Sequence, residues 1–215
     1  MAQYLQIHPE TPQPRLIARA AEAVRNGGVM IYPTDSCYAL GCQIGDKAAM
    51  ERIRFIRRLD DKHPLTLVCR DLSDIATYAR IDNQAYRLLK SVTPGPYTFI
   101  YQATKQVPRR LLHPKRRAIG IRVPDTPICR ALLGALAQPI LSTTLILPGD
   151  DAPLEDTYEM RETLGHCVDL IIDGGFCGNQ PTTVLDMTGE QPVLVRHGKG
   201  DLAPFGLDAA SLEDA

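Results

Sequence analysis

The sequence predicts a mixed α/β (α+β) protein built on a twisted, open sheet that is flanked by helices. Apolar, strand-like runs alternate with amphipathic helical patterns along most of the chain, which is typical of α/β architectures. Hydrophobic residues make up 44% of the sequence and charged residues 23%, as in a globular domain. A chain of 215 residues can bury a substantial core. We expect one domain over residues 1–206 and a flexible tail over 207–215.

The first half of the chain carries clear start and stop signals. Gly27 and Gly28 end a pattern of apolar residues at helical spacing. Pro33 cannot donate a hydrogen bond within a central ladder, so we expect it to end a strand and begin a polar turn that closes at Gly41. The expected elements are a helix over 15–26, a strand over 29–32, a helix capped by Asp46 that ends near 59–61, a strand over 65–69, a helix capped by Asp71 and a helix over 83–92.

The second half is predicted to add mainly strands. Asp125 is expected to cap its principal helix, because Pro127 is well suited to the first helical turn. The expected elements are strands over 97–102 and 118–123, the helix capped by Asp125, a strand over 140–147, one short helix in the acidic stretch that ends at Glu162, and strands over 168–172, 182–187 and 193–196.

The sequence gives no indication of secretion or of membrane insertion. Residues 1–14 have no basic start and no long apolar run, and no run of about eighteen apolar residues occurs elsewhere. We therefore expect a cytoplasmic protein. The six cysteines and five histidines are scattered, and no two cysteines lie two residues apart. We expect free thiols, no metal site and no tightly bound cofactor.

Positive and negative charges are unevenly divided along the chain. Residues 1–130 hold 21 Lys and Arg against 11 Asp and Glu, whereas residues 131–215 hold 3 against 14. This division predicts a basic face for a polyanion, because Lys and Arg contacts to phosphates supply most non-specific nucleic-acid affinity. The alternative is that the two halves interleave in one domain and their charges largely compensate.

A hydroxyl and a carboxylate follow the strand predicted over residues 29–32. Thr34 and Asp35 come directly after Pro33 in the segment IYPTDSCYALG. Ligands of open α/β sheets bind at the ends of strands, so these side chains are candidates for a binding site. The alternative is that Thr34 and Asp35 only cap a turn through their own side chains.

Hydroxyl and guanidinium groups gather at several predicted strand ends. Arginine offers paired donors to phosphate or carboxylate, and serine and threonine can donate to phosphate oxygens. The sequence contains no glycine-rich dinucleotide motif, no P-loop and no nucleophile elbow, so a nucleotide would have to bind in another way. Alternatively, the threonines reflect β propensity and the arginines pair with surface acids. The candidates are Thr34, Arg122, Ser142, Thr143, Thr144, Thr182, Thr183 and Arg196.

Residues 31–41 resemble the signature of the YrdC/YciO family, in which proline, threonine, an acidic residue and Thr-Val-Tyr-Gly-Leu-Gly follow an apolar strand. The resemblance extends over roughly residues 13–201 and is closest to the YciO branch. It implies a three-layer YrdC-like fold. It also implies a site that makes threonylcarbamoyl-adenylate for tRNA modification from ATP, L-threonine and bicarbonate. The matching signature residues are Pro33, Thr34, Asp35, Tyr38, Leu40 and Gly41, whereas Ser36, Cys37 and Ala39 differ.

The resemblance also implies roles for individual residues. Thr34 is the signature threonine that contacts the amino acid substrate, and Arg196 matches the arginine of the final strand. The implied substrate-binding residues are Thr34, Arg122, Ser142 and Thr182, and the implied nucleotide-binding residues are Arg57, Arg58, Thr144 and Arg196.

Two motifs of the synthases are altered in this chain. Their Lys-x-Arg motif aligns with residues 57–59, and their Ser-x-Asn motif aligns with residues 144–146. Leu59 and Ile146 therefore stand where the synthases have side chains that contact ATP. At Leu59 a charge-assisted interaction of about 1.5–3 kcal/mol is lost, and at Ile146 an apolar side chain replaces a carboxamide. We expect a degenerate site with weak synthase activity, for which Mg-ATP is a substrate and no catalytic residue can be named.

Two other functions remain open. The family fold is associated with a concave basic face that binds double-stranded RNA or tRNA, and A-form RNA is recognised largely through its shape and phosphates. The third hypothesis is an enzyme of the same fold that acts on another small anion, in a pocket reshaped by Leu59 and Ile146. The expected RNA-binding residues are Arg52, Arg54, Arg109, Arg110, Lys115, Arg116 and Arg117.

Overall fold

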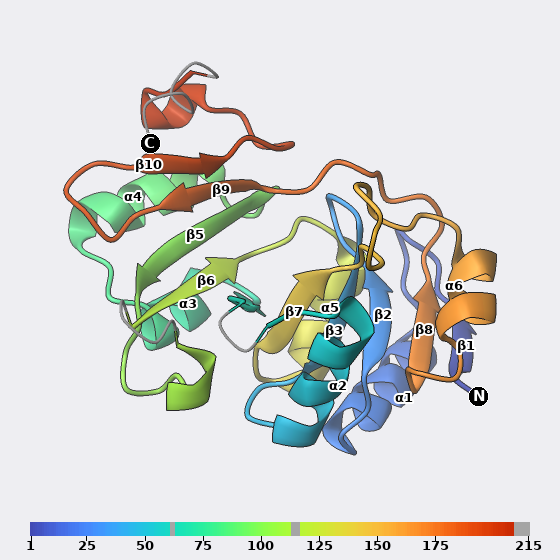
Figure 1. The fold of residues 1–215 in the computed structure, drawn as a ribbon. Coiled ribbons are helices and arrows are strands. Elements are labelled where there is room, and N and C mark those ends of the chain that lie inside the picture. Colours follow the sequence, from blue (N-terminus) through green and yellow to red (C-terminus); the bar gives the residue numbers. More distant parts are fainter. Residues whose placement is uncertain (61–62, 113–116, 209–215) are drawn as a thin grey trace.

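The computed structural model describes residues 1–60, 63–112 and 117–208. These residues form a ten-stranded sheet flanked by helices, which confirms the mixed α/β fold (Figure 1). Residues 209–215 of the expected tail lie outside the described part of the chain. The helices are α1 (Pro14–Arg25), α2 (Lys47–Arg57), α3 (Leu72–Tyr78), α4 (Asn83–Val92), α5 (Pro127–Leu136) and α6 (Thr157–Leu164), with short 3-10 helices η1 (Arg109–Leu111) and η2 (Ala203–Phe205). The strands are β1 (Gln3–Gln6), β2 (Met30–Pro33), β3 (Tyr38–Gln43), β4 (Thr66–Val68), β5 (Tyr97–Gln102), β6 (Ala118–Arg122), β7 (Ile140–Thr144), β8 (Leu170–Asp173), β9 (Thr183–Asp186) and β10 (Val193–Arg196).

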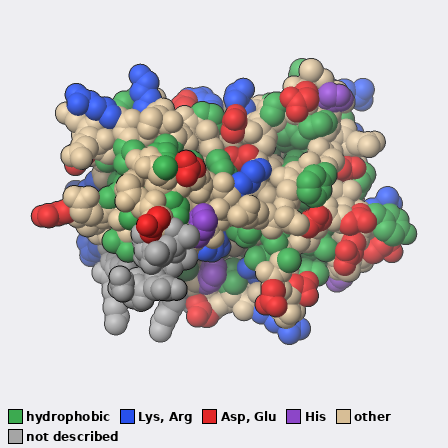
Figure 2. All heavy atoms as spheres, turned by 90° about the horizontal axis from the view of Figure 1, so that it is seen from above, with side chains coloured by type: hydrophobic (Ala, Val, Ile, Leu, Met, Phe, Trp, Pro, Cys, Tyr) green, Lys and Arg blue, Asp and Glu red, His purple; other side chains and the backbone are tan. Residues whose placement is uncertain are grey.

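Early and late parts of the chain alternate within the sheet. The strand order is β1-β8-β2-β3-β7-β4-β6-β5-β9-β10, with parallel pairs such as β1-β8 and β4-β6 beside antiparallel pairs such as β2-β3 and β5-β6. Arg52 of the basic half forms an ion pair of 2.8 Å with Asp169 of the acidic half. Blue and red side chains are intermixed on the face seen in Figure 2. The two oppositely charged halves therefore interleave within the sheet. This is the alternative interpretation of the charge pattern.

Helices cover the two faces of the sheet unequally. On one face α2, α3, α4 and α6 pack over the main core, which includes Leu40, Leu67 and Ile121. On the other face α1 and α5 pack over a second core that includes Met30 and Ile140. This second layer covers the region of β1, β8 and β2, and the sheet twists away from it toward β5, β9 and β10 (Figure 1). The part of the face that α1 and α5 leave uncovered carries a pocket lined by residues of β6, β7 and β10.

The capping residues of α2 and α5 were both predicted from the sequence, and one of the two predictions is wrong. Asp46 accepts a hydrogen bond of 3.0 Å from Ala49 N at the start of α2, as predicted. The cap of α5 is Thr126 and not Asp125, because the Thr126 hydroxyl accepts from Cys129 N at 3.1 Å. The Asp125 carboxylate instead pairs with Arg130. In the described part of the chain, no helix is long and apolar enough to cross a membrane.

The turn after β2 leads into a strand that the sequence analysis missed. Gly41 was expected to end the segment, but it lies inside β3 and pairs with Met30. The strand needs glycine here because an added Cβ would lie 2.8 Å from both Ile140 Cγ2 and Tyr32 Cε1. The short edge strand β1 was also missed, and β7 ends at Thr144, three residues earlier than predicted.

Candidate anion-binding pocket on the sheet face

A pocket of about 490 Å³ lies on the sheet face, beyond the layer formed by α1 and α5. Alternate residues of several strands line it, because successive side chains of a strand point to opposite faces. Ala118, Gly120 and Arg122 of β6 face the pocket, whereas Ile119 and Ile121 between them are buried in the main core. Small side chains on the pocket side leave space for a ligand. The lining residues are Cys37, Ala39, His63, Pro64, Thr66, Thr98, Ile100, Ala118, Gly120, Arg122, Ser142, Thr143, Thr144, Thr182, Val184 and Arg196.

The pocket carries cationic groups and no carboxylate among the described residues that line it. Arg196 at the end of β10 is held against Thr182, whose carbonyl accepts from Arg196 Nε at 3.2 Å and Nη2 at 2.9 Å. Partial burial lowers the pKa of Arg196 from its usual value, and Arg122 contributes in the same direction. Two arginines at one pocket create a site suited to a phosphate or carboxylate.

Arg122 lies at the end of β6 and forms a buried ion pair with Asp35. Each of the two side chains is 9% exposed. The other carboxylate oxygen of Asp35 accepts a hydrogen bond of 2.9 Å from Asp125 N. Arg122 Nε is buried and has no hydrogen-bond partner among the described residues. One predicted site residue is thus already neutralised by a neighbouring acid.

Several hydroxyl groups of the pocket are used within the protein. Ser142 Oγ accepts from the Tyr32 hydroxyl at 2.8 Å and lies 2.9 Å from Leu40 O, to which it donates. Thr98 and Thr182 share a hydrogen bond of 2.9 Å between their hydroxyls. Thr144, at the end of β7, is half-buried in the lining. Ser142 therefore contributes to the stability of the pocket, and Thr144 is better placed to meet a ligand.

Thr34 forms the turn between β2 and β3. Its hydroxyl donates to Cys37 O at 2.7 Å and accepts from the backbone N–H groups of Ser36 and Cys37, both at 3.3 Å. The turn-capping interpretation therefore describes its hydrogen bonds in this structure. Thr34 lines a smaller cavity of about 280 Å³ together with Asp35 and Lys199, and does not line the larger pocket. The Arg122–Asp35 ion pair joins residues of the two cavities.

The predicted cations at the end of α2 lie outside the pocket. Arg57 donates to Ile146 O and is half-buried, and burial lowers its pKa. Arg58 adopts a left-handed conformation at φ 50° as the C-cap of α2 and lines a different cavity. Leu59 packs against the main core. In this structure, neither arginine of the altered Lys-x-Arg segment lines the pocket.

The predicted RNA-binding residues differ in their environments, because some are already paired within the protein and others line a groove. Arg52 is paired with Asp169, and Arg54 lies 3.8 Å from Glu51 with a largely buried side chain. Arg110 donates to Gly45 O. Arg109 and Arg117 line a separate groove of about 610 Å³ together with Arg80 and Lys105, and no carboxylate is among the described residues that line it. Lys115 and Arg116 lie outside the described residues.

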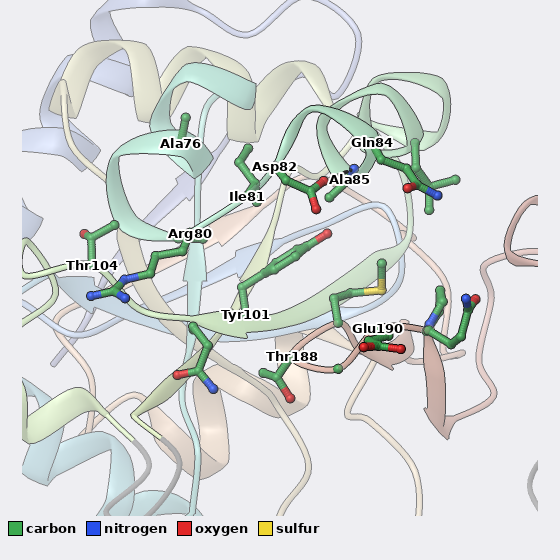
Figure 3. A pocket seen from close by; sticks show the side chains of 17 residues that line it. Ala76, Arg80, Ile81, Asp82, Gln84, Ala85, Tyr101, Thr104, Thr188 and Glu190 are labelled. Carbon is green, nitrogen blue, oxygen red and sulfur yellow. Dashed lines mark hydrogen bonds between the residues drawn. The ribbon is translucent and has the colours of Figure 1, made fainter.

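A further cavity, of about 790 Å³, lies between α3, α4, β5 and the turn that joins β9 to β10 (Figure 3). Tyr101 of β5 lines this cavity, and its buried hydroxyl has no hydrogen-bond partner among the described residues. Arg80, Asp82 and Glu190 around it carry charges of both signs. This lining therefore combines both signs of charge, whereas the described lining of the sheet-face pocket has no carboxylate.

Sequence reasoning missed several lining residues of the sheet-face pocket. Thr98, Gly120 and Val184 were not identified. The alternation of side chains between the two faces of a strand could have predicted them. His63 also lines the pocket, and burial together with the nearby Arg57 lowers its pKa. Cys37 reaches the same lining, where burial raises the pKa of its thiol. All six cysteines are free in the structure.

The fold and the site define an α/β protein with a cation-bearing pocket on an open sheet face. A family model described as Sua5_yciO_yrdC, telomere recombination, matches residues 22–198. The chain belongs to the Sua5/YciO/YrdC family. The predicted resemblance is thereby confirmed.

Similar proteins come from both branches of this family. YciO of Escherichia coli (strain K12) is 58% identical over 205 residues, which cover 95% of this chain and 100% of that protein. The crystal structure of E. coli YciO matches with a TM-score of 0.92 and 57% identity over 95% of this chain and 100% of that one. The threonylcarbamoyl-AMP synthase of Chromohalobacter salexigens is 30% identical over 173 residues, 80% of this chain and 92% of that protein.

A structural match links the fold to an amino acid ligand in a relative. P. abyssi Sua5 complexed with L-threonine matches with a TM-score of 0.84 and 26% identity, over 92% of this chain and 58% of that chain.

Proposed function

We propose that the chain binds a nucleotide in the sheet-face pocket and has weak threonylcarbamoyl-AMP synthase-like activity. The observation that carries this proposal is the pocket itself, where Arg196 and Arg122 meet hydroxyl groups with no carboxylate among the described lining residues. Such a lining suits a phosphate ester. A family member named threonylcarbamoyl-AMP synthase and a Sua5 structure with L-threonine support the choice of substrates.

The proposed reaction needs no covalent nucleophile on the protein. The amine of L-threonine adds to bicarbonate and water leaves, which gives a carbamate. A carbamate oxygen then bonds to the α-phosphorus of ATP as the bond to the β-phosphate oxygen breaks, and pyrophosphate leaves. Arg196 would stabilise charge on the α-phosphate, while the smaller cavity beside Thr34 and Lys199 would accommodate the amino acid. Mg²⁺ would neutralise the leaving pyrophosphate, and the reaction would take place in the cytoplasm.

The test is pyrophosphate release from ATP, Mg²⁺ and bicarbonate, with and without L-threonine. We expect slow, threonine-dependent release by the wild-type protein. Arg196→Met should reduce this release by about tenfold or more, because a charge-assisted contact is lost. Arg19→Met is the matched control, since Arg19 is an exposed arginine of α1. Wild-type protein that shows no threonine-dependent release would contradict the proposal.

Thr34→Ala is a less informative variant than Arg196→Met. The Thr34 hydroxyl makes four hydrogen bonds within the turn between β2 and β3, one of them with the Ser36 hydroxyl. Loss of activity in Thr34→Ala would therefore have two causes, the loss of a substrate contact and a change in the turn.

RNA binding is the second candidate function, and the groove lined by Arg80, Lys105, Arg109 and Arg117 favours it. Four cations with no carboxylate among the described lining residues suit a phosphate backbone. Binding of a double-stranded RNA should weaken steeply with salt. Arg109→Gln should lower the magnitude of the slope of log K against log salt by about 1. Arg52→Gln is the control, because Arg52 is already paired with Asp169. An affinity that does not change with salt would exclude this function.

A further inference from the structure

The charge balance of the sheet-face pocket restricts the ligands that it can hold. Among the described lining residues, three side chains can carry positive charge: Arg122, Arg196 and His63. The buried ion pair with Asp35 neutralises Arg122. Burial and the nearby Arg57 lower the pKa of His63, which favours the neutral imidazole at pH 7.

Arg196 therefore carries the uncompensated positive charge of this described lining. The hydrogen-bond acceptors that hold its guanidinium are Thr182 O and Thr182 Oγ1, the latter at 3.3 Å, and both are uncharged. The guanidinium keeps its full charge because arginine remains protonated at neutral pH. One such group can complement one phosphate.

A triphosphate has requirements that this lining does not meet. Phosphoryl-transfer sites hold triphosphates with Mg²⁺ and additional cations, and protein-bound Mg²⁺ is usually held by one or two carboxylates. No Asp or Glu is among the described residues of the pocket. Neither Arg57 nor Arg58 is among the described residues that line the pocket, since Arg57 donates to Ile146 O beyond the end of β7 and Arg58 lines another cavity.

The uncharged part of the pocket suits a nucleoside. Ile100, Ala118 and Val184 provide an apolar surface beside the hydroxyls of Thr66 and Thr144. Ligand sites commonly combine an apolar surface with a few polar groups that fix orientation, in cavities of about 300–1,000 Å³. The volume of about 490 Å³ falls in this range.

We propose that the sheet-face pocket selects a nucleoside 5′-monophosphate, or an acyl ester of one, over a nucleoside triphosphate, with the single phosphate bound by Arg196. The proposal rests on the proposed function in that it assigns a nucleotide to the same pocket. It adds that the described residues of the lining offer the β- and γ-phosphates of ATP no further uncompensated cation. The site therefore matches the adenylate that a synthase would release better than the ATP that it would consume.

The test is isothermal titration calorimetry of the full chain with AMP and with ATP, each with and without Mg²⁺. We expect AMP to bind about tenfold more tightly than ATP under both conditions, a difference of about 1.4 kcal/mol. ATP that binds as tightly as AMP, or more tightly, would overturn the proposal.

Variants of Arg196 test where the phosphate lies. Arg196→Met should weaken AMP binding about tenfold or more, and Arg196→Lys should restore part of the loss because the positive charge is retained. Arg19→Met, at an exposed arginine of α1, is the matched control and should bind AMP like the wild type. Unchanged AMP affinity in a folded Arg196→Met protein, as judged by its melting temperature, would overturn the assignment.

The outcomes separate this inference from the proposed function. AMP binding that depends on Arg196, without threonine-dependent pyrophosphate release, would remove the synthase activity and support the ligand class. Threonine-dependent release together with tighter binding of ATP than AMP would support the synthase activity and overturn the preference for a monophosphate. A protein that binds neither nucleotide would overturn both.

Discussion

Arg122 in β6 and Asp35 in the turn between β2 and β3 form a buried ion pair that joins the lining of the sheet-face pocket to that of the smaller cavity. Both side chains are 9% exposed, and Asp35 also accepts a hydrogen bond from Asp125 N at the start of the segment that leads into α5. The pair therefore connects the signature turn, the pocket and the second helical layer. It also leaves Arg196 as the pocket arginine whose acceptors are uncharged.

Replacing Asp35 should destabilise the fold strongly. Asp35→Asn leaves the Arg122 guanidinium buried without a counter-charge, which costs about 3–5 kcal/mol. Urea denaturation measures the free energy of unfolding. The control is Asp125→Asn, because Asp125 pairs with Arg130 at 3.3 Å on the surface and such pairs contribute about 1 kcal/mol or less. Equal losses in the two variants would contradict the role assigned to the buried pair.

Ser142→Ala should affect stability more than ligand binding. Its hydroxyl is engaged by Tyr32 at 2.8 Å and Leu40 O at 2.9 Å, and its removal leaves the buried Tyr32 hydroxyl without its acceptor. The cost should be about 1–3 kcal/mol in the free energy of unfolding. Calorimetry with AMP should give an affinity close to the wild type. A loss of affinity as large as that of Arg196→Met would show instead that Ser142 contacts the ligand.

Gly41→Ala and Gly134→Ala should change stability in opposite directions. At Gly41 in β3, the new methyl group would lie 2.8 Å from Ile140 Cγ2 and Tyr32 Cε1, so overpacking should cost about 1–3 kcal/mol. At Gly134 in α5, the added carbon would meet no described heavy atom within 4 Å apart from its chain neighbours and the backbone of its own helix, and alanine should stabilise the helix by up to about 1 kcal/mol. Thermal denaturation of the two variants measures both effects. A Gly41→Ala protein as stable as the wild type would show that the β3 packing described here is wrong.

The fold should lose stability in alkaline solution through its buried thiols. Burial raises the pKa of Cys42 from 9 to about 12, and Asp46 adds to the shift. Between pH 9 and 12 the unfolded chain releases the thiol proton while the folded chain keeps it, so the free energy of unfolding falls as pH rises. Urea denaturation between pH 8 and 10.5 should show a shallower fall in Cys42→Ala than in the wild type. Cys167→Ala, at a half-buried thiol, is the control. The same slope in Cys42→Ala and wild type would contradict this assignment.

The sequence predicted the fold where periodicity and caps were clear. The helix starts at Asp46 and Asp71 and the apolar strands over 97–102 and 118–123 match the structure closely. It failed at β3, where Gly41 resembled a terminator although close packing against Ile140 explains the glycine. Local sequence does not report such tertiary contacts.

The site was predictable only in part. Arg122, Thr144, Thr182 and Arg196 do come together at one pocket, as expected for side chains at strand ends. The engagement of Arg57 by Ile146 O depends on how α2 packs beside the end of β7, which spacing along the chain does not specify. The sequence could not decide between the two roles of Thr34, because the same residue types bind ligands and form turns. In the structure its hydroxyl bonds within the turn.

A crystal structure of the protein with AMP at saturating concentration tests the central claim most directly. We expect nucleotide density in the sheet-face pocket, with the base and ribose over Ala118 and Gly120 and the phosphate against the Arg196 guanidinium. Density in the groove of Arg80 and Lys105, or an empty sheet-face pocket at saturation, would contradict the account.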